Sequence, residues 1–255
     1  GSAAVAASDK FGPYLEGTAP RLAAMVELTE ERAWELRGRS LEALGHVALA
    51  VGNEKFAPYR DTALRAAAAN LEFDSTELAE YSYGFFANCA KVMRNDFGPL
   101  LPQLVPHLLD VAARKDAASF DFAESDDEGG GLAAFLDEGD DGDQWVDDEG
   151  EEESDDDSLA GQAVVTVRTA MMNVKRASIV AIGNLAEYTE GLFAPHLDAA
   201  LQCLKVLVDY FHHEIRERAA IALQQLVHGA CLAHGGSARD PAYVAPPNDE
   251  KEPQA

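Results

Sequence analysis

A short phrase, in which proline follows phenylalanine by two residues, recurs four times along this chain of 255 residues. It begins at Phe11, Phe56, Phe97 and Phe193 and reads Phe-Gly-Pro or Phe-Ala-Pro each time. Proline suits the first turn of a helix, where its missing N–H would have no partner, and the phenylalanine before it can pack against the helix that follows. The phrase therefore predicts four helix starts.

The intervals between these phrases predict a structural repeat. Successive phenylalanines lie 45, 41 and 96 residues apart, and a period of about 40–47 residues is typical of HEAT and armadillo units, each built around a pair of helices. The third interval exceeds that period by about fifty residues. This excess indicates an insertion between the two helices of the third unit.

Helical periodicity dominates the rest of the chain. Apolar residues recur at steps of three and four within 174–185, 197–211 and 215–230, whereas the alternating pattern of strands is nearly absent. A helical hairpin of this kind covers its apolar face only by stacking on its neighbours. We therefore predict an all-α fold: a right-handed HEAT-repeat solenoid of about four helical hairpins with a long disordered acidic insertion.

Three glycines occupy the middle of predicted helices within a second recurring phrase. They are Gly45, Gly84 and Gly183. Glycine inside a helix costs about 1 kcal/mol relative to alanine. Three such costs at matched places predict that two helices approach closely at each glycine.

The predicted insertion is a polyanion. Residues 116–158 contain twenty acidic residues and no Lys, Arg or His, although the whole chain, with 45 acids and 20 bases, has a formal net charge of −25. High charge and low apolar content disfavour collapse. We expect helical units at 3–115, a disordered acidic insertion at 116–160, further helical units at 161–234 and a flexible tail at 235–255.

Charge and composition exclude several classes of function. The acidic excess argues against binding to nucleic acid or to an anionic membrane surface and favours basic partners. Cys89, Cys203 and Cys231 are far apart and form no zinc motif. No nucleophile elbow, phosphate-binding loop or zinc-protease motif occurs. We expect no catalytic residue, no metal, no cofactor and no enzymatic activity, and no apolar run is long enough to span a membrane.

The residues resemble a known family. The opening Phe-x-Pro-Tyr-Leu, the phrases Ala-Leu-Gly-His-Val-Ala at 43–48 and Ala-Ile-Gly-Asn-Leu-Ala at 181–186, and the long acidic insertion are similar to the importin-β (karyopherin-β) superfamily. More narrowly, they resemble the branch of importin-4 and its fungal counterpart, over roughly residues 11–234. Members of the family are much longer, so the resemblance implies an internal fragment without the N-terminal Ran-binding arch.

Two sets of candidate cargo-binding residues follow. The first lies in the acidic insertion, where high negative charge attracts Lys/Arg-rich chains. It comprises Asp126, Asp127, Glu128, Asp140, Asp141, Asp143, Trp145, Asp147, Asp148, Glu149, Glu151, Glu152, Glu153, Asp155, Asp156 and Asp157. In the resembled family the second helix of each unit lines the concave groove, which implies a second set of acids, amides and aromatics: Glu35, Glu42, His46, Glu80, Tyr81, Asn88, Asn184 and Glu187.

The resemblance implies a nuclear import receptor that shuttles between cytoplasm and nucleus. Its cargo would be basic proteins such as histones and ribosomal proteins, released by Ran in its GTP form in the full-length receptor, and nucleoporins are allowed as further partners. Two alternatives stay open: a HEAT scaffold subunit for folded protein partners, and an acidic histone chaperone in which the insertion alone is sufficient.

Overall fold

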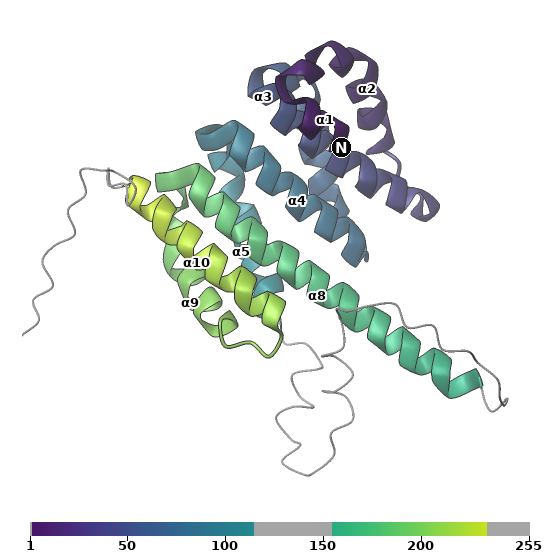
Figure 1. The fold of residues 1–255 in the computed structure, drawn as a ribbon, viewed down its shortest axis with the longest axis vertical. Coiled ribbons are helices and arrows are strands. Elements are labelled where there is room, and N and C mark those ends of the chain that lie inside the picture. Colours follow the sequence, from purple (N-terminus) through teal and green to yellow (C-terminus); the bar gives the residue numbers. More distant parts are fainter. Residues whose placement is uncertain (1, 115–154, 234–255) are drawn as a thin grey trace, which may run out of the picture. The chain divides into compact units, whose positions relative to one another are not determined.

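The predicted repeats are pairs of helices in a computed structural model (Figure 1). It describes residues 2–114 and 155–233, without the side chains of residues 2, 9 and 155–168. No strand occurs in these ranges. The elements, in chain order, are α1 (Ser2–Ala7), η1 (Ser8–Tyr14), α2 (Leu15–Met25), η2 (Glu31–Ala33), α3 (Trp34–Asn70), α4 (Thr76–Met93), η3 (Arg94–Leu100), α5 (Leu101–Ala113), α8 (Asp155–Thr189), η4 (Glu190–His196), α9 (Leu197–Leu207) and α10 (His213–Ala233).

The chain separates into two compact units. One comprises the described residues of Gly1–Ala113 and Val174–Ala255, and the other those of Arg114–Asn173. The first unit holds the helical pairs, to which α8 contributes its residues from Val174 onward. In each pair the first helix is α2, the second half of α3, α5 or α9, and the second helix is the first half of α3, α4, α8 or α10.

The boundary of the acidic insertion differs from the prediction. The sequence analysis placed residues 155–160 in a disordered insertion, whereas the structure places them in the first turns of α8. Asp155, Asp156 and Asp157 are therefore helical, which is favourable because negative charge in a first turn complements the helix dipole. The other predicted residues of the insertion, and the predicted tail at 235–255, lie outside the described residues.

The chain passes from one pair of helices to the next through a residue with positive φ. Gly52 has φ +81°, Arg94 has φ +54° and Glu190 has φ +48°, and Ser8, with φ +47°, precedes the first pair. Each lies three or four residues before the phenylalanine of the recurring phrase. A left-handed residue ends a helix and redirects the chain. At Gly52 this break divides α3 into the second helix of one pair and the first helix of the next.

The phenylalanines of the recurring phrase anchor these junctions in the core. Phe56, Phe97 and Phe193 are at most 2% exposed, and Phe11, near the N-terminal end, is half-buried. Burying a side chain of this size stabilises the fold by about 1.5–3 kcal/mol. The prediction that the phrase marks helix starts is confirmed at Phe11, Phe97 and Phe193, where the phrase forms the short 3-10 turns η1, η3 and η4 that lead into α2, α5 and α9. The phrase at Phe56 instead lies within α3, where the helix resumes after the break at Gly52.

The prediction of close helix approach holds at two of the three glycines. A Cβ at Gly45 would lie 3.0 Å from Asn88 Nδ2, and one at Gly183 would lie 3.0 Å from Ala222 Cα. At Gly84 the prediction is wrong, because a Cβ there would meet nothing within 4 Å. Gly84 instead faces an open space between α4 and α8.

A buried cation on a second helix donates to carbonyls at or just beyond the end of a first helix. Arg37 donates from Nη1 to the Leu28 carbonyl at 2.8 Å and from Nη2 to the Ala66 carbonyl at 3.1 Å. Lys175 Nζ donates to the Ala112 carbonyl at 2.9 Å. The last carbonyls of a helix have no partner within it and carry partial negative charge, so a cation is favoured there.

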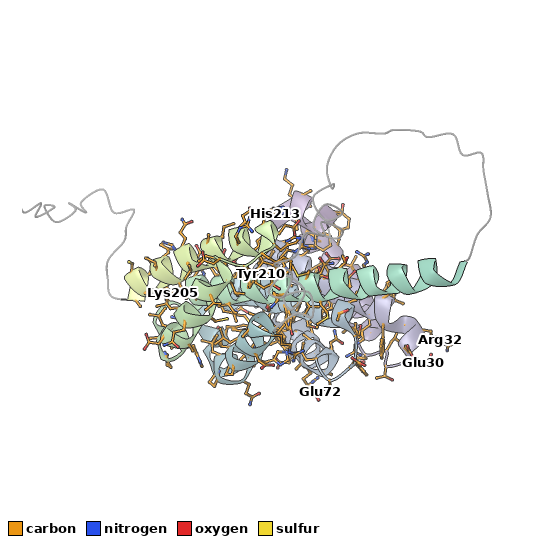
Figure 2. All side chains as sticks on the ribbon, turned by 90° about the horizontal axis from the view of Figure 1, so that it is seen from below. Glu30, Arg32, Glu72, Lys205, Tyr210 and His213 are labelled. Atoms are coloured by element: carbon orange, nitrogen blue, oxygen red, sulfur yellow. The ribbon has the colours of Figure 1, made fainter. Side chains whose placement is uncertain are left out.

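The turns of the first two pairs expose charged side chains. Glu30 and Arg32 form an ion pair at 2.6 Å in the first turn, and Glu72 lies in the second (Figure 2). Exposed ion pairs contribute about 0–1 kcal/mol. These turns therefore add little stability, and the fold depends on the packed faces between helices.

Candidate functional site

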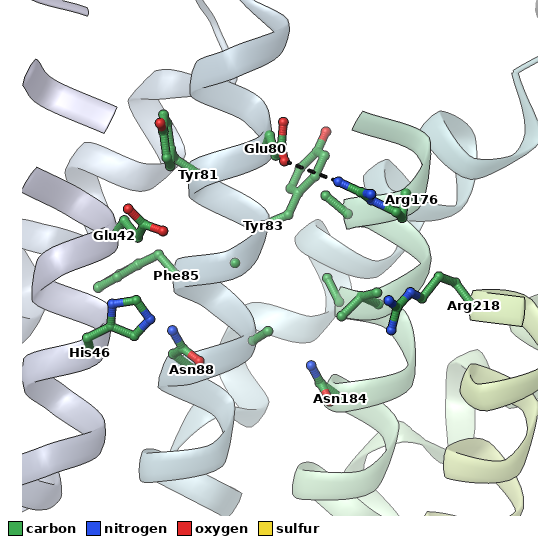
Figure 3. A pocket seen from close by; sticks show the side chains of 15 residues that line it. Glu42, His46, Glu80, Tyr81, Tyr83, Phe85, Asn88, Arg176, Asn184 and Arg218 are labelled. Atoms are coloured by element: carbon green, nitrogen blue, oxygen red, sulfur yellow. Dashed lines mark ion pairs between the residues drawn. The ribbon is translucent and has the colours of Figure 1, made fainter. Parts of the chain in front are cut away.

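A pocket of about 400 Å³ opens among the second helices, where α4 and α8 are not in close contact at Gly84 (Figure 3). Its walls come from α3, α4, α8 and α10, all of them second helices. The lining residues named in the argument are Glu42, His46, Glu80, Tyr81, Asn88, Arg176, Asn184 and Arg218. Pockets of this volume are large enough for ligand side chains.

The wall formed by α3 and α4 carries acids, an amide and an aromatic ring. Glu42 and Glu80 are half-buried. The Arg39 guanidinium lies 5.4 Å from the centre of the Tyr81 ring and 4.0 Å from the Glu42 carboxylate. Burial raises the pKa of Tyr81 to about 12, so its hydroxyl stays protonated at neutral pH. This wall therefore offers carboxylates and a neutral ring to a cation.

The opposite wall, formed by α8 and α10, carries two arginines. Arg176 bridges Glu214, at 3.0 Å, and Glu80, at 3.9 Å. Arg218 lines the pocket and has no hydrogen bond or ion pair within the ranges 2–114 and 155–233. The pocket therefore has a negative side and a positive side, and Arg176 partly neutralises the acid nearest to it.

Two predicted residues of α8 are held by α10. Gln225 Nε2 donates to Asn184 Oδ1 at 2.9 Å and to Glu187 Oε2 at 2.8 Å. His228 Nδ1 lies 3.4 Å from Glu187 Oε1. Asn184 still lines the pocket, whereas Glu187 does not.

The structure brings together six of the eight predicted concave-face residues around this pocket. They are Glu42, His46, Glu80, Tyr81, Asn88 and Asn184. Glu35 is exposed near the start of α3 and lies outside the lining, as does Glu187. Of the predicted residues in the acidic insertion, Asp155, Asp156 and Asp157 begin α8, and all others lie outside the described residues.

Sequence reasoning missed the two arginines of the pocket. Arg176 precedes Gly183 by seven residues, so the two share a helix face, and this spacing is a signal that was available. Arg218 carries no such signal, because only the packing of α10 against α8 brings it to the pocket. His46 Nδ1 is also buried without a hydrogen-bond partner among the described residues.

The described residues contain no cluster of three or more His, Cys, Asp or Glu side chains placed to hold a metal ion. None of the described helices combines the length and the apolar character needed to cross a membrane. The three cysteines form no disulfide, and burial raises the pKa of the Cys89 and Cys203 thiols.

Stacked two-helix units with a row of second helices define an α-solenoid of the HEAT type. No family model matches the chain. It is 31% identical over 225 residues to "Probable importin subunit beta-4" of Schizosaccharomyces pombe, covering 88% of this chain and 20% of the relative. It is 25% identical over 252 residues to "Importin-4" of Mus musculus, covering 94% of this chain and 21% of the relative. The chain belongs to the importin-β superfamily and is similar to importin-4 and its fungal counterpart.

Solved structures show the same fold. A crystal structure of Kap121p bound to Pho4p superimposes with a TM-score of 0.60 at 20% identity, covering 91% of this chain and 20% of Kap121p. Kap121p bound to the SUMO protease Ulp1p superimposes with the same TM-score over 89% of this chain. The chain thus spans about a fifth of the length of the curated relatives.

Proposed function

We propose that this chain is a cargo-binding part of a nuclear import receptor and that it recognises basic protein segments at the pocket between its second helices. The observation that carries the proposal is the convergence of six predicted residues on one pocket in a chain of the importin-β superfamily. The Kap121p structures, bound to Pho4p and to Ulp1p, support protein binding by a solenoid of this fold.

The chemistry of the α3–α4 wall suits a lysine or arginine side chain. Glu42 and Glu80 supply carboxylates, Asn88 supplies an amide oxygen, and the Tyr81 ring supplies a π face. Charge-assisted hydrogen bonds to carboxylates are about twice as strong as neutral ones, and a cation over an aromatic ring adds about 0.5–1 kcal/mol at an exposed site. A cargo cation competes with Arg176 at Glu80, and with Arg39 at Glu42 and at the Tyr81 ring.

The acidic residues that precede α8 extend this proposal. Their charge raises the encounter rate with basic cargo, such as histones and ribosomal proteins, over the screening length of about 8–10 Å in physiological salt. In the whole receptor, release by Ran-GTP and shuttling between cytoplasm and nucleus belong to the same proposal, and no catalytic step is involved.

The first prediction concerns the two pocket carboxylates. The double variant Glu42→Gln/Glu80→Gln is expected to bind a fluorescent histone-tail peptide about fivefold to tenfold more weakly, since two partly exposed charge contacts contribute about 1–1.4 kcal/mol. Fluorescence anisotropy at fixed ionic strength measures the change.

The matched control is the double variant Glu16→Gln/Glu27→Gln, which removes two exposed acids from α2 and the turn after it, away from the pocket. The control variant is expected to bind within twofold of the unaltered chain. If both variants bind the peptide equally weakly, binding depends on net charge alone. That result would contradict the assignment of the binding site to the pocket.

The second prediction separates the pocket from the acidic insertion. A chain in which an uncharged Gly/Ser linker of equal length replaces residues 116–154, which leaves α8 complete, is expected to bind the same peptide more weakly and with a smaller dependence on salt, but to retain measurable binding. Titrations at several salt concentrations test this.

The other outcomes favour the alternatives. Complete loss of binding when the linker replaces the insertion would show that the pocket alone does not bind the peptide and would favour an acidic histone chaperone. No binding by either form of the chain would favour a scaffold for folded partners. Both results would contradict a role for the pocket in recognising basic segments.

A further inference from the structure

Resting on the proposed function, we propose that Arg218 is an anion-binding subsite of the pocket. The favoured peptide would carry a basic side chain, held at Glu42 on α3, and a carboxylate or phosphate side chain, held at Arg218 on α10. The pocket would then select segments of mixed charge rather than the most basic ones.

Arg218 differs from the arginines around it in having no ion pair or hydrogen bond to the residues that the structure describes. Arg176 is held by Glu214 and Glu80, and Arg216, two residues before Arg218 on the same helix, donates to the carbonyls of Tyr210 and Phe211. Arg218 makes no ion pair or hydrogen bond to any residue in the described part of the chain. A half-buried guanidinium without a partner has donors left for a ligand.

The surroundings of Arg218 strengthen its attraction for an anion. Its side chain reaches from α10 to the pocket beside α8 (Figure 3). The residues of α8 that line the pocket include the apolar Ala177, Val180 and Ala181. Apolar walls lower the local dielectric, which strengthens a charge-assisted hydrogen bond. A guanidinium also presents paired donors that match the oxygens of carboxylate and phosphate groups.

The arrangement of the walls explains why one ligand would need both charges. Glu42 and Arg218 come from the two outermost helices of the lining, on opposite sides of the pocket in Figure 3. Gly84, between them on α4, places no side chain in the space. Glu80 lies 3.9 Å from Arg176 and Glu42 lies 4.0 Å from Arg39, so a basic ligand group competes with an arginine at either carboxylate. Arg218 is the lining charge that has no ion pair among the described residues, so an added anionic group on the same ligand would gain a contact there without competition.

Peptides that differ only in one anionic residue test the proposal. A fluorescein-labelled peptide with one lysine is compared with versions that also carry glutamate or phosphoserine at several short spacings from the lysine. The best mixed-charge peptide is expected to bind the full chain about tenfold more tightly than the lysine-only peptide. Arg218→Gln is expected to abolish that gain, and Arg218→Lys to restore part of it. A larger gain from phosphoserine identifies phosphate as the preferred group, whereas equal gains identify the carboxylate as sufficient.

The control variant is Arg21→Gln, which removes an exposed positive charge from α2. The inference is overturned if the lysine-only and mixed-charge peptides bind equally, or if Arg21→Gln removes the gain as effectively as Arg218→Gln. In both cases the proposed function survives, because the lysine-only peptide still binds. Failure of every peptide to bind the unaltered chain would instead contradict the proposed function itself.

Discussion

Replacing Arg37 with methionine is expected to lower the free energy of unfolding by about 3–5 kcal/mol. Arg37 is 3% exposed, and its guanidinium donates to the Leu28 and Ala66 carbonyls and to Asn70 Oδ1. Methionine fills a similar volume but removes the donor from two buried acceptors, Asn70 Oδ1 and the Ala66 carbonyl, and from the part-buried Leu28 carbonyl, and a buried acceptor without its donor costs about 1–3 kcal/mol. Relaxation and water entry reduce the sum to the stated range.

The loss extends through a connected polar network. Asn70 Nδ2 donates to Ser82 Oγ at 3.0 Å, and Ser82 Oγ donates to the Leu78 carbonyl at 2.8 Å, so the network joins α3 to α4. Urea denaturation followed by circular dichroism measures the change. Arg65→Met, at an exposed position of the same helix, is the control and is expected to change stability by less than about 0.5 kcal/mol. Equal losses for the two variants would show that the buried hydrogen bonds contribute little.

Gly229→Ala is expected to destabilise the chain by about 2 kcal/mol, although alanine is the better helix former. A Cβ at Gly229 would lie 2.2 Å from the Ala186 carbonyl oxygen, and backbone atoms of α8 cannot move aside as a flexible side chain can. Inserting a methyl group into such a contact costs about 1–3 kcal/mol. The penalty exceeds the gain of about 1 kcal/mol in helix propensity when α8 and α10 must separate.

Gly84→Ala is the matched control, with the opposite sign. Nothing lies within 4 Å of a Cβ at this position, so helix propensity alone determines the change in the free energy of unfolding. The variant is expected to be more stable by up to about 1 kcal/mol. Thermal and urea unfolding of the two variants under one set of conditions provides the comparison. Stabilisation by both changes would contradict the close contact between α8 and α10.

Local sequence patterns predicted the helical pairs because the preferences that start and end a helix act between residues that are close in the sequence. Proline can occupy only particular backbone positions, and the phenylalanine two residues before it becomes buried at each junction between pairs, as Phe56, Phe97 and Phe193 show. The positive φ at Arg94 and Glu190 could not be read from these residue types, since neither is a residue that favours left-handed backbone. The surrounding packing imposes that conformation.

The candidate site was predictable in part for a related reason. Helical spacing placed Glu42 and His46 on one face, and the matched phrase placed Asn184 on the equivalent face of another unit, so their convergence followed from the repeat. Whether such a residue is available to a ligand depends on its neighbours in space. Gln225 engages Asn184 and Glu187, Arg176 engages Glu80, and no sequence spacing links these residues.

The sequence by itself determined the helical repeat, the positions where pairs of helices meet and the concentration of acid before α8, because periodicity, proline and charge act over a few residues at a time. The tertiary structure alone decided where the second helices stand apart. Gly45, Gly84 and Gly183 are equivalent in sequence, yet a Cβ would be crowded at the first and the third and unopposed at the second. That difference arises from the packing of whole helices against one another, and it creates the pocket that brings Arg218 opposite Glu42.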